Sequence, residues 1–359
     1  MNQIKAFFRV DASFEIGYGH IYRCLTLADA LASRGVRSTF ACRNLEGIPL
    51  DLIKSRGHNL ELITIPDNYL KSKTHMPVFS KSAWSYDAAV SRNLINKPIE
   101  FIIVDHYEID FQWEQELKDL SKKFIVIDDL ANRKHNCNFL IDQNLGSTKE
   151  DYKTLISKDT KLFIGPKYAL LRPEFKKYRD YSVNRRQDLD IQNILISFGG
   201  ADKNNFVKKI LITLKKIKLP KLSKIEIIVG KGKTQKESLK EICKSFPFVV
   251  NFYEDISNMA EIMAQSDLII GAAGSSSWER CSLGIPSIIF ILAENQKKVA
   301  YALEKEKCSI LVKENEFFED DLISALDYFS NTSNLKKSIN TCRNICDGDG
   351  VNKIIRRML

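Results

Sequence analysis

The sequence predicts an α/β protein with two doubly wound, Rossmann-like domains. Two patterns carry this prediction: short strands rich in Ile, Val and Phe alternate with helical segments, and the alternation is interrupted once, between about residues 145 and 190. Apolar strands that are each followed by a helix are typical of a parallel sheet covered on both faces. The chain has 359 residues, which is long for one hydrophobic core and sufficient for two.

The first half of the chain contains six candidate strands separated by helical segments. The strands are KAFFRV, RSTFAC, LELITI, EFIIVDH, KFIVIDD and NFLIDQN, and helices are expected at 20–34, 84–95 and 110–121. The interruption that follows includes the charged stretch KKYRDYSVNRRQDLD, which has little periodicity. We therefore expect an N-terminal domain at 1–175 and a linker at 176–190.

The second half repeats the alternation. Its candidate strands are QNILISF, KIEIIVG, FVVNFY, DLIIGA, PSIIFIL and SILVKE, with helices expected near 203–218, 234–245, 257–265, 276–283, 296–306 and 318–328. This predicts a C-terminal α/β domain at 191–345 and a helical tail at 346–359. Ligands of doubly wound sheets bind outside the carboxyl ends of the strands, so the predicted site is an interdomain cleft.

The charge pattern argues against a nucleic-acid partner. The net charge is +9, and residues 203–244 alone contain 13 lysines and three acidic residues. These lysines alternate with Ile and Leu at helical spacing, as they do on the solvated faces of amphipathic helices. Arginines and aromatic residues, which read bases or stack on them, are nearly absent from this segment.

Other compositional features predict a reduced, cytoplasmic protein. No apolar run approaches the roughly 18–20 residues that cross a bilayer, and the N-terminus lacks a signal-peptide core, so no stable membrane association is expected. The eight cysteines are scattered without a CxxC pair, which predicts reduced thiols. We expect no metal and no cofactor, and the sequence does not indicate an oligomeric state.

The stretch EIGYGHIYRC places a histidine where a strand ends and a helix begins. KAFFRVDA before it has the composition of a buried strand, and apolar residues recur at helical spacing after His20. The positive end of a helix disfavours an imidazolium, so a neutral ring is expected, as a general base requires. Gly17 and Gly19 would let a bulky substrate approach closely. His20 is therefore the candidate base.

Two glycine turns in the second half each follow a predicted strand. One is ISFGGAD, with Gly199 and Gly200, and the other is GAAGSSSWE, with Gly274, Ser275 and Ser276. Backbone N–H groups at such turns are open to an anion, and a diphosphate fits. The chain contains neither GxGxxG nor GxxxxGK[ST], so neither a dinucleotide fingerprint nor a P-loop is present.

Glu279 has two interpretations of about equal weight. It lies on the first turn of the helix after the second glycine turn, where it could accept hydrogen bonds from two neighbouring ribose hydroxyls. Alternatively, Ser276 and Glu279 form a capping box that only satisfies the helix end.

The remaining polar residues near strand ends are weaker candidates. His58 and His75 lie in loop-like sequence, whereas His106 and His135 fall near strand ends and could border a ligand or be structural. Paired acids suggest a metal, but adjacent strand residues point to opposite faces, so one metal would not take both carboxylates of the pair. The acids at predicted strand ends are Asp11, Asp105, Asp128 and Asp129.

Taken together, the motifs resemble the UDP-sugar hydrolases of pseudaminic acid biosynthesis, which are similar to glycosyltransferases of the GT-B fold. The matching stretches are RVDASFEIGYGHIYRCLTLA, VIDDLANRKHNC with DQN, GPKYALLRPEF, ILISFGGAD, and IGAAGSSSWERCSLGIP ending in ENQ. They extend from residue 9 to residue 296 and so cover both expected domains. The resemblance implies a GT-B-like fold and hydrolysis of UDP-2,4-diacetamido-2,4,6-trideoxy-β-L-altropyranose to the free sugar and UDP.

The resemblance also implies residue roles. His20 would deprotonate the water that attacks the anomeric carbon with inversion, and the C-terminal domain would hold UDP. Glu279 matches the ribose-binding acid, and Ile256 with Met259 lies where the related transferases hold uracil. The candidate substrate-binding residues are Gly17, Tyr18, Gly19, Arg23, Arg172, Gly199, Gly200, Ile256, Met259, Gly274, Ser275, Ser276, Glu279, Asn295 and Gln296.

Several alternatives remain open at this stage. A GT-B glycosyltransferase would use His20 to activate an acceptor hydroxyl instead of water. A hydrolase for another UDP-diacetamido sugar, a sugar 2-epimerase and a non-catalytic nucleotide-sugar-binding module are the others. Product analysis separates the enzymes, and UDP binding without turnover would indicate the binding module.

Overall fold

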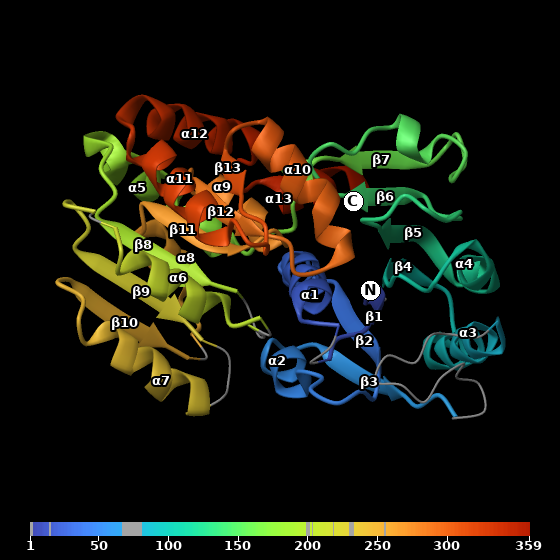
Figure 1. Ribbon diagram of the computed structural model, residues 1–359. Helices are drawn as coiled ribbons and strands as arrows, with labels where there is room; N and C mark the ends of the chain where they lie inside the picture. Colours follow the sequence, from blue (N-terminus) through green and yellow to red (C-terminus); the bar gives the residue numbers. More distant parts are fainter. Residues whose placement is uncertain are drawn as a thin grey trace. The chain divides into compact units, whose positions relative to one another are not determined.

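The computed structural model describes residues 3–13, 16–66, 81–198, 202, 204–217, 219–229, 233–254 and 256–359 (Figure 1). The chain divides into two compact units. The first comprises Met1–Leu171 together with Asp349–Leu359, and the second comprises Arg172–Gly348. Each unit is built around its own parallel sheet, as the sequence predicts.

The first unit contains a seven-stranded sheet with the order β3-β2-β1-β4-β5-β6-β7. All of its neighbouring strands pair in parallel. The strand order reverses between β1 and β4, which makes this the switch point of the sheet. The strands are β1 (Lys5–Val10), β2 (Arg37–Arg43), β3 (Asn59–Ile63), β4 (Ile99–Asp105), β5 (Ser121–Ile127), β6 (Phe139–Asp142) and β7 (Lys161–Ile164).

Helices cover both faces of this sheet because alternate strand residues point in opposite directions. On β1, Phe8 joins a core shared with α1 (Gly19–Ala32), α2 (Leu50–Ser55) and α13 (Gly350–Met358). Its neighbour Phe7 joins a separate core shared with α3 (Lys81–Ile95) and α4 (Phe111–Leu117). Short 3₁₀ turns complete the unit at Lys118–Leu120, Glu150–Tyr152 and Pro166–Tyr168.

The second unit contains a six-stranded sheet with the order β10-β9-β8-β11-β12-β13. All of its neighbouring strands also pair in parallel, and its switch point lies between β8 and β11. The strands are β8 (Asn193–Ser197), β9 (Lys224–Ile228), β10 (Val249–Tyr253), β11 (Leu268–Ala272), β12 (Ser287–Phe290) and β13 (Ser309–Leu311).

The helices of the second unit surround this sheet. One core joins β8, β9 and β11 to α6, α7, α11 and α12, and α9 packs on β11, α5 and α12. The helices are α5 (Pro173–Asn184), α6 (Phe206–Leu214), α7 (Lys233–Cys243), α8 (Met259–Ala264), α9 (Ser276–Ser282), α10 (Lys297–Lys305), α11 (Phe318–Ser330) and α12 (Thr332–Ile345), with 3₁₀ turns at Arg185–Asp188 and Glu294–Gln296.

The prediction of a linker at 176–190 is wrong. Most of it forms α5 and the 3₁₀ turn after it, and it belongs to the second unit. Two arginines of this charged stretch form internal hydrogen bonds: Arg179 donates to the carbonyls of Ser282 and Cys346, and Arg186 donates to that of Ser266. Because arginines with such partners replace apolar residues here, the sequence lacks the periodic apolar pattern that would predict a helix.

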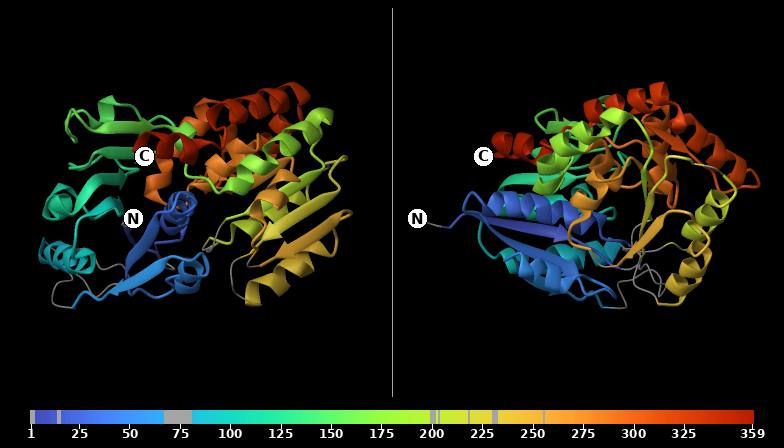
Figure 2. Two further views of the ribbon diagram at one scale, coloured as in Figure 1. Left: turned by 180° about the vertical axis from the view of Figure 1, so that it is seen from behind. Right: turned by 90° about the vertical axis from the view of Figure 1, so that its left-hand side faces the viewer.

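The ends of the expected domains also differ from the structure. The first unit ends at Leu171 rather than at 175, and the chain returns to it at Asp349, within the expected tail. There α13, the last red helix of Figure 2, packs on α1 and on the turn at Pro166–Tyr168. The predicted cleft between the domains stays a prediction.

Two further expectations about the chain can be compared with its described part. No disulfide joins any two of the eight cysteines, all of which lie in the described part of the chain. Within the described residues, no helix has the length and apolar character needed to cross a membrane.

Candidate active site

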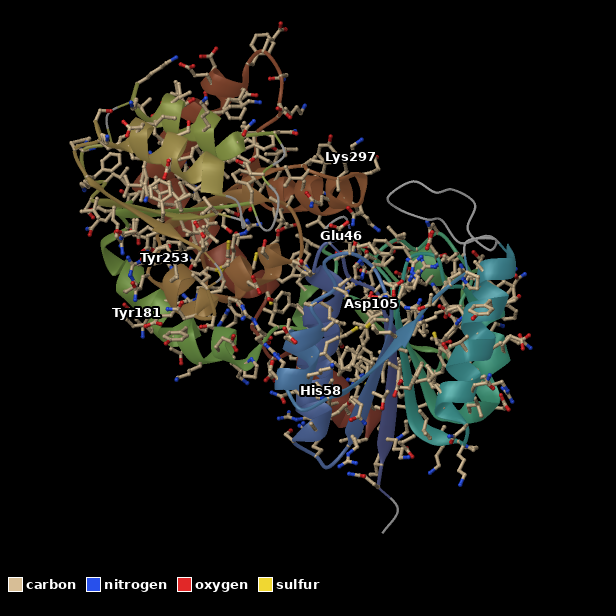
Figure 3. All side chains as sticks on the ribbon, turned by 90° about the horizontal axis from the view of Figure 1, so that it is seen from below. Glu46, His58, Asp105, Tyr181, Tyr253 and Lys297 are labelled. Atoms are coloured by element: carbon tan, nitrogen blue, oxygen red, sulfur yellow. The ribbon has the colours of Figure 1, made fainter. Side chains whose placement is uncertain are left out.

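His20 and Asp105 meet at the switch point of the first sheet. Asp105 is the last residue of β4, and His20 is the second residue of α1, which follows β1. The carboxyl ends of β1 and β4 are neighbours, so both side chains reach the same edge of the sheet. Figure 3 labels Asp105 inside the first unit.

The contact between the two residues fixes the imidazole. His20 Nδ1 lies 2.7 Å from Asp105 Oδ1, and the His20 side chain is 11% exposed. Arg23 Nη2 also lies 3.0 Å from His20 Nδ1, but it donates to Asp105 Oδ1 at 2.6 Å. An ionised carboxylate only accepts hydrogen bonds, so we assign the proton to Nδ1, which donates it to Asp105. Nε2 is then the basic nitrogen, and the described part of the chain offers it no hydrogen-bond partner.

Asp105 is held ionised by the groups around it. Arg23 donates to both of its oxygens, from Nε and Nη2, each at 2.6 Å. Burial of Asp105 raises its pKa, but the Arg23 guanidinium and His20 outweigh burial and hold the pKa well below its ordinary value. A permanently charged carboxylate is what keeps the His20 proton on Nδ1.

Arg23, one of the predicted substrate-binding residues, is buried and joins two carboxylates, and its contact with substrate stays a prediction. Its side chain is only 6% exposed, and its Nη1 donates to Asp129 Oδ2 at 2.6 Å. Tyr107 donates to the same Asp129 oxygen at 3.2 Å, and its ring packs edge-on against His20 with centroids 4.6 Å apart. Arg23 thus ties two carboxylates together beneath His20 and positions the pair.

The loop before His20 is shaped by its own hydrogen bonds. Gly17 has a φ of 80°, a conformation that favours glycine, and its N–H donates to the Ser13 carbonyl at 2.9 Å. The Tyr18 hydroxyl donates to the carbonyl of Gly47 at 3.0 Å. Gly19 is exposed at the first position of α1, so it leaves the approach to His20 open.

The other described histidines have structural partners. His106 donates from Nε2 to Asp11 at 2.7 Å, and its Nδ1 accepts the N–H of Glu108. His135 pairs through Nδ1 with Glu114 at 2.6 Å, and both side chains are fully buried. His75 lies outside the described residues. Neither His106 nor His135 touches His20.

Asp128 and Asp129 have separate partners, as opposite-facing neighbours should. Arg133 and Tyr152 donate to Asp128, whereas Arg23 and Tyr107 donate to Asp129. The two carboxylates therefore do not converge.

In the second unit, the turn after β11 presents open backbone donors. The backbone N–H groups of Gly274, Ser275 and Ser276 make no hydrogen bond within the described part of the chain. A Cβ on Gly274 would lie 3.7 Å from Gln296 Nε2, so the Gln296 amide is next to the turn. Gln296 is itself held by the Leu292 N–H, which donates to its Oε1 at 2.9 Å.

Glu279 does not close a capping box. The N-cap of α9 is Ser275, and no side chain caps this helix. Instead, Glu279 Oε1 lies 3.8 Å from Arg172 Nη2, so two of the predicted substrate-binding residues come together. Burial raises the pKa of Glu279, and the nearby Arg172 only partly offsets it.

The remaining candidates follow other strand ends of the same sheet edge. Ile256 and Met259 lie just after β10, whose last residue, Tyr253, is labelled in Figure 3. Asn295 is exposed on the 3₁₀ turn after β12. Gly199 and Gly200, which follow β8, lie outside the described residues.

Sequence reasoning missed the partnership of Asp105 with His20 and the role of Asp129. Both acids were noted only as strand-end residues. The available signal was the parallel order of the strands: polar residues at the ends of adjacent strands share one edge. The sequence does not say that β1 and β4 are the adjacent pair.

Comparison with known proteins places these observations among related sequences. Residues 193–345 match the glycosyltransferase family 28 C-terminal domain. The chain is 28% identical to the UDP-2,4-diacetamido-2,4,6-trideoxy-beta-L-altropyranose hydrolase of Campylobacter jejuni, over 84% of this chain and 97% of that protein. It is 27% identical to an uncharacterized protein of Methanocaldococcus jannaschii, over 80% of this chain but only 56% of that protein's length.

The fold also has a close counterpart among solved structures. The crystal structure of Acinetobacter baumannii MurG aligns with a TM-score of 0.71 over 99% of both chains, at 14% sequence identity. The two parallel Rossmann-like sheets and this alignment establish a GT-B-like fold.

Proposed function

We propose that the chain is a UDP-sugar hydrolase in which His20 activates water. The observation that carries the proposal is the His20–Asp105 contact of 2.7 Å, which leaves Nε2 basic and without a partner in the described residues. A general base needs a neutral imidazole nitrogen aimed at its proton donor, and an orienting carboxylate is the usual way to secure one.

The proposed step breaks the bond between the anomeric carbon and the diphosphate oxygen. Water attacks the anomeric carbon from the opposite side and passes its proton to His20 Nε2, and UDP departs with the bonding electron pair. The products are the inverted free sugar and UDP. UDP is a good leaving group, so base catalysis of roughly 10²–10⁴-fold, together with positioning, meets the need.

The second unit is proposed to hold UDP. The open N–H groups of residues 274–276 suit a diphosphate, whose oxygens accept hydrogen bonds. Glu279 suits the ribose hydroxyls, and the Arg172 next to it keeps a charged donor available to the ligand. The backbone of Ile256, together with Met259, is proposed to bind uracil. Asn295 and Gln296 are proposed to contact the sugar. Gly199 and Gly200 are proposed to let the backbone approach the nucleotide at a second point.

The extent of sequence similarity supports our choice of hydrolysis as the proposed activity. The hydrolase from Campylobacter jejuni aligns with 84% of this chain and 97% of its own length, whereas the glycosyltransferase family model matches only residues 193–345. That segment carries the proposed UDP site, which both activities need. The same relative supports UDP-2,4-diacetamido-2,4,6-trideoxy-β-L-altropyranose as substrate. The motifs that resemble the UDP-sugar hydrolases of pseudaminic acid biosynthesis support that pathway as the setting.

Product analysis tests the proposal. The purified chain is incubated with that UDP-sugar, UDP release is followed, and the sugar product is identified by NMR. Wild type should form free sugar with inverted anomeric configuration, and His20→Ala should bind UDP normally while losing turnover. If UDP appears only when an acceptor alcohol is added, the chain is a GT-B transferase and His20 activates that alcohol. An epimerised product would indicate a 2-epimerase.

A further inference from the structure

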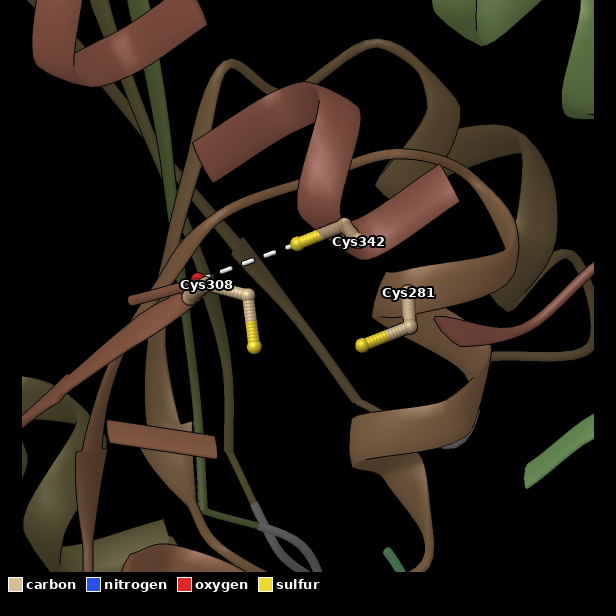
Figure 4. A group of neighbouring side chains, drawn as sticks. All are labelled: Cys281, Cys308 and Cys342. Atoms are coloured by element: carbon tan, nitrogen blue, oxygen red, sulfur yellow. Dashed lines mark hydrogen bonds between the residues drawn. The ribbon is translucent and has the colours of Figure 1, made fainter. Parts of the chain in front are cut away.

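Three cysteines that are far apart in the sequence meet inside the second unit. Cys281 lies on α9, Cys308 directly precedes β13, and Cys342 lies on α12. Their sulfur atoms all lie within 4.8 Å of one another, and each residue is at most 2% exposed. Figure 4 shows the three side chains entering one space from three separate segments.

This spacing is close to that of a thiolate metal site. A Zn–S bond is about 2.3 Å, so three sulfurs around one zinc ion are about 4 Å apart. Because no separation exceeds 4.8 Å, none has to shrink by more than about 1 Å to reach that geometry. Side-chain rotation of three residues on separate elements can supply this movement without a change of fold.

The charge next to the three thiols also fits a bound metal. Arg280 adjoins Cys281 on α9 and is 1% exposed, yet it forms no ion pair in the described part of the chain. One nitrogen donates to Ala272 O at 2.9 Å and to Ser277 Oγ at 2.7 Å, while Nε has no partner. A buried, unpaired charge is costly. A divalent ion with three thiolates carries a net charge of −1, which would offset the charge of Arg280.

We propose that Cys281, Cys308 and Cys342 bind one thiophilic divalent metal ion of the zinc class. Binding replaces three S–H protons, which go to solvent, with three metal–sulfur bonds. Two of the thiols now donate to backbone carbonyls: Cys308 Sγ lies 3.3 Å from Leu303 O, and Cys342 Sγ lies 3.4 Å from Ile285 O. The site is outside the proposed catalytic residues, and it links α9, which follows the turn at 274–276, to α12.

Cadmium is a suitable probe because its thiolate complexes absorb in the ultraviolet. The reduced, metal-free full-length chain is titrated with Cd²⁺, passed through a desalting column, and assayed for bound metal and for the charge-transfer band. We expect one tightly bound Cd²⁺ per chain, a band of three-thiolate intensity, a raised Tm, and affinity that increases with pH because protons are displaced.

Variants separate this site from incidental thiol binding. Cys308→Ala should lower Cd²⁺ affinity by more than the roughly 10–100-fold that is typical for loss of a supporting group, and Arg280→Met should lower it by about that amount. Cys346→Ala is the matched control, because Cys346 is also buried and lies one turn beyond Cys342, outside the three-cysteine group. It should bind like wild type.

Two results would overturn the proposal. One is a folded, fully reduced wild-type chain that retains no Cd²⁺ after desalting. The other is equal binding by wild type and Cys308→Ala. If Cys308→Ala does not fold, the intensity of the wild-type band decides alone, since fewer than three thiolates per bound ion contradicts the site.

Discussion

His20 and Asp105 work as a unit because the carboxylate determines which imidazole nitrogen carries the proton. An amide at position 105 could donate to Nδ1 and place the proton on Nε2, where it blocks base catalysis. We therefore expect Asp105→Asn to lower kcat by about 10²–10⁴-fold while KM for the UDP-sugar changes little. Steady-state kinetics on the folded variant, checked by its Tm, measures this.

The chain offers a matched control for that substitution. His58 Nε2 lies 2.9 Å from Asp29, and Arg56 donates to Asp29 at 2.6 Å, so Asp29 has the same kinds of partner as Asp105. Asp29 lies on α1 away from the switch point, and Asp29→Asn should leave kcat unchanged. Equal losses in the two variants would mean that Asp105 has only a structural role.

Asp142 predicts a pH dependence of stability. Burial raises its pKa to about 6, although hydrogen bonds from the Asn144 N–H and from Tyr152 oppose this. The folded chain therefore binds this proton more tightly than the unfolded chain does, and the unfolding free energy falls as the pH rises from about 4 to 6. Asp142→Asn removes the cost of ionising this buried carboxyl, so its unfolding free energy should rise relative to that of wild type by up to about 3 kcal/mol over that pH range.

The neighbouring carboxylate should respond with the opposite sign. Burial of Asp128 raises its pKa, but Arg133 and His135 outweigh burial and lower it overall. Asp128→Asn should therefore be destabilising at neutral pH, with the deficit closing as the pH falls through the acidic range. Urea unfolding of both variants at several pH values measures the two trends, and parallel curves would contradict this assignment.

At the scale of elements, substitutions of two glycines in and after β11 should have different effects, one on stability and the other on UDP binding. A Cβ on Gly271 would lie 2.1 Å from the Ser197 carbonyl oxygen on β8, whereas one on Gly274 would meet only Gln296 at 3.7 Å. Gly271→Ala should cost about 1–3 kcal/mol or more of unfolding free energy, because the strands must move apart.

Gly274→Ala should keep wild-type stability and weaken UDP binding, since a methyl group would crowd the open N–H groups of the turn. Thermal unfolding and UDP titration of the two variants test the contrast. A Gly274→Ala chain that binds UDP as tightly as wild type would remove the turn from the proposed diphosphate site.

The strands were more predictable than the segments between them. KAFFRV and DLIIGA coincide closely with β1 and β11, because strands buried on both faces carry continuous apolar runs. The 14-residue α12 and the helix α5 were not predicted. In α5, Arg179 donates to backbone carbonyls, and such hydrogen bonds leave no periodic pattern in the sequence.

The sequence indicated several residues of the candidate site, but it did not indicate which of them contact one another. His20 was proposed from its place at a helix start, whereas Arg23, given only as a candidate for substrate binding, lies between two carboxylates. Its burial between Asp105 and Asp129 depends on strand order, which a single sequence does not specify. The thiol group around Cys308 was missed for the same reason.

For the whole molecule, the path of the chain makes the stability of the first unit depend on its last residues. Ile354 and Ile355 of α13 are fully buried in the core shared with α1. Ile354→Ala should cost the first unit about 2–5 kcal/mol, and Arg356→Ala, on the exposed side of the same helix, should cost little. Hydrogen exchange at α1 measures the effect, and unchanged protection there in Ile354→Ala would contradict it.

The most direct test of the central claim is the origin of the oxygen on the product sugar. The chain and its His20→Ala variant are given the UDP-sugar in isotopically labelled water, and the free sugar and UDP are analysed by mass spectrometry and NMR. The account predicts that wild type places the label on the anomeric carbon and none on UDP, while the variant binds UDP and releases almost no sugar. Label on the phosphate, or equal turnover by His20→Ala, would contradict it.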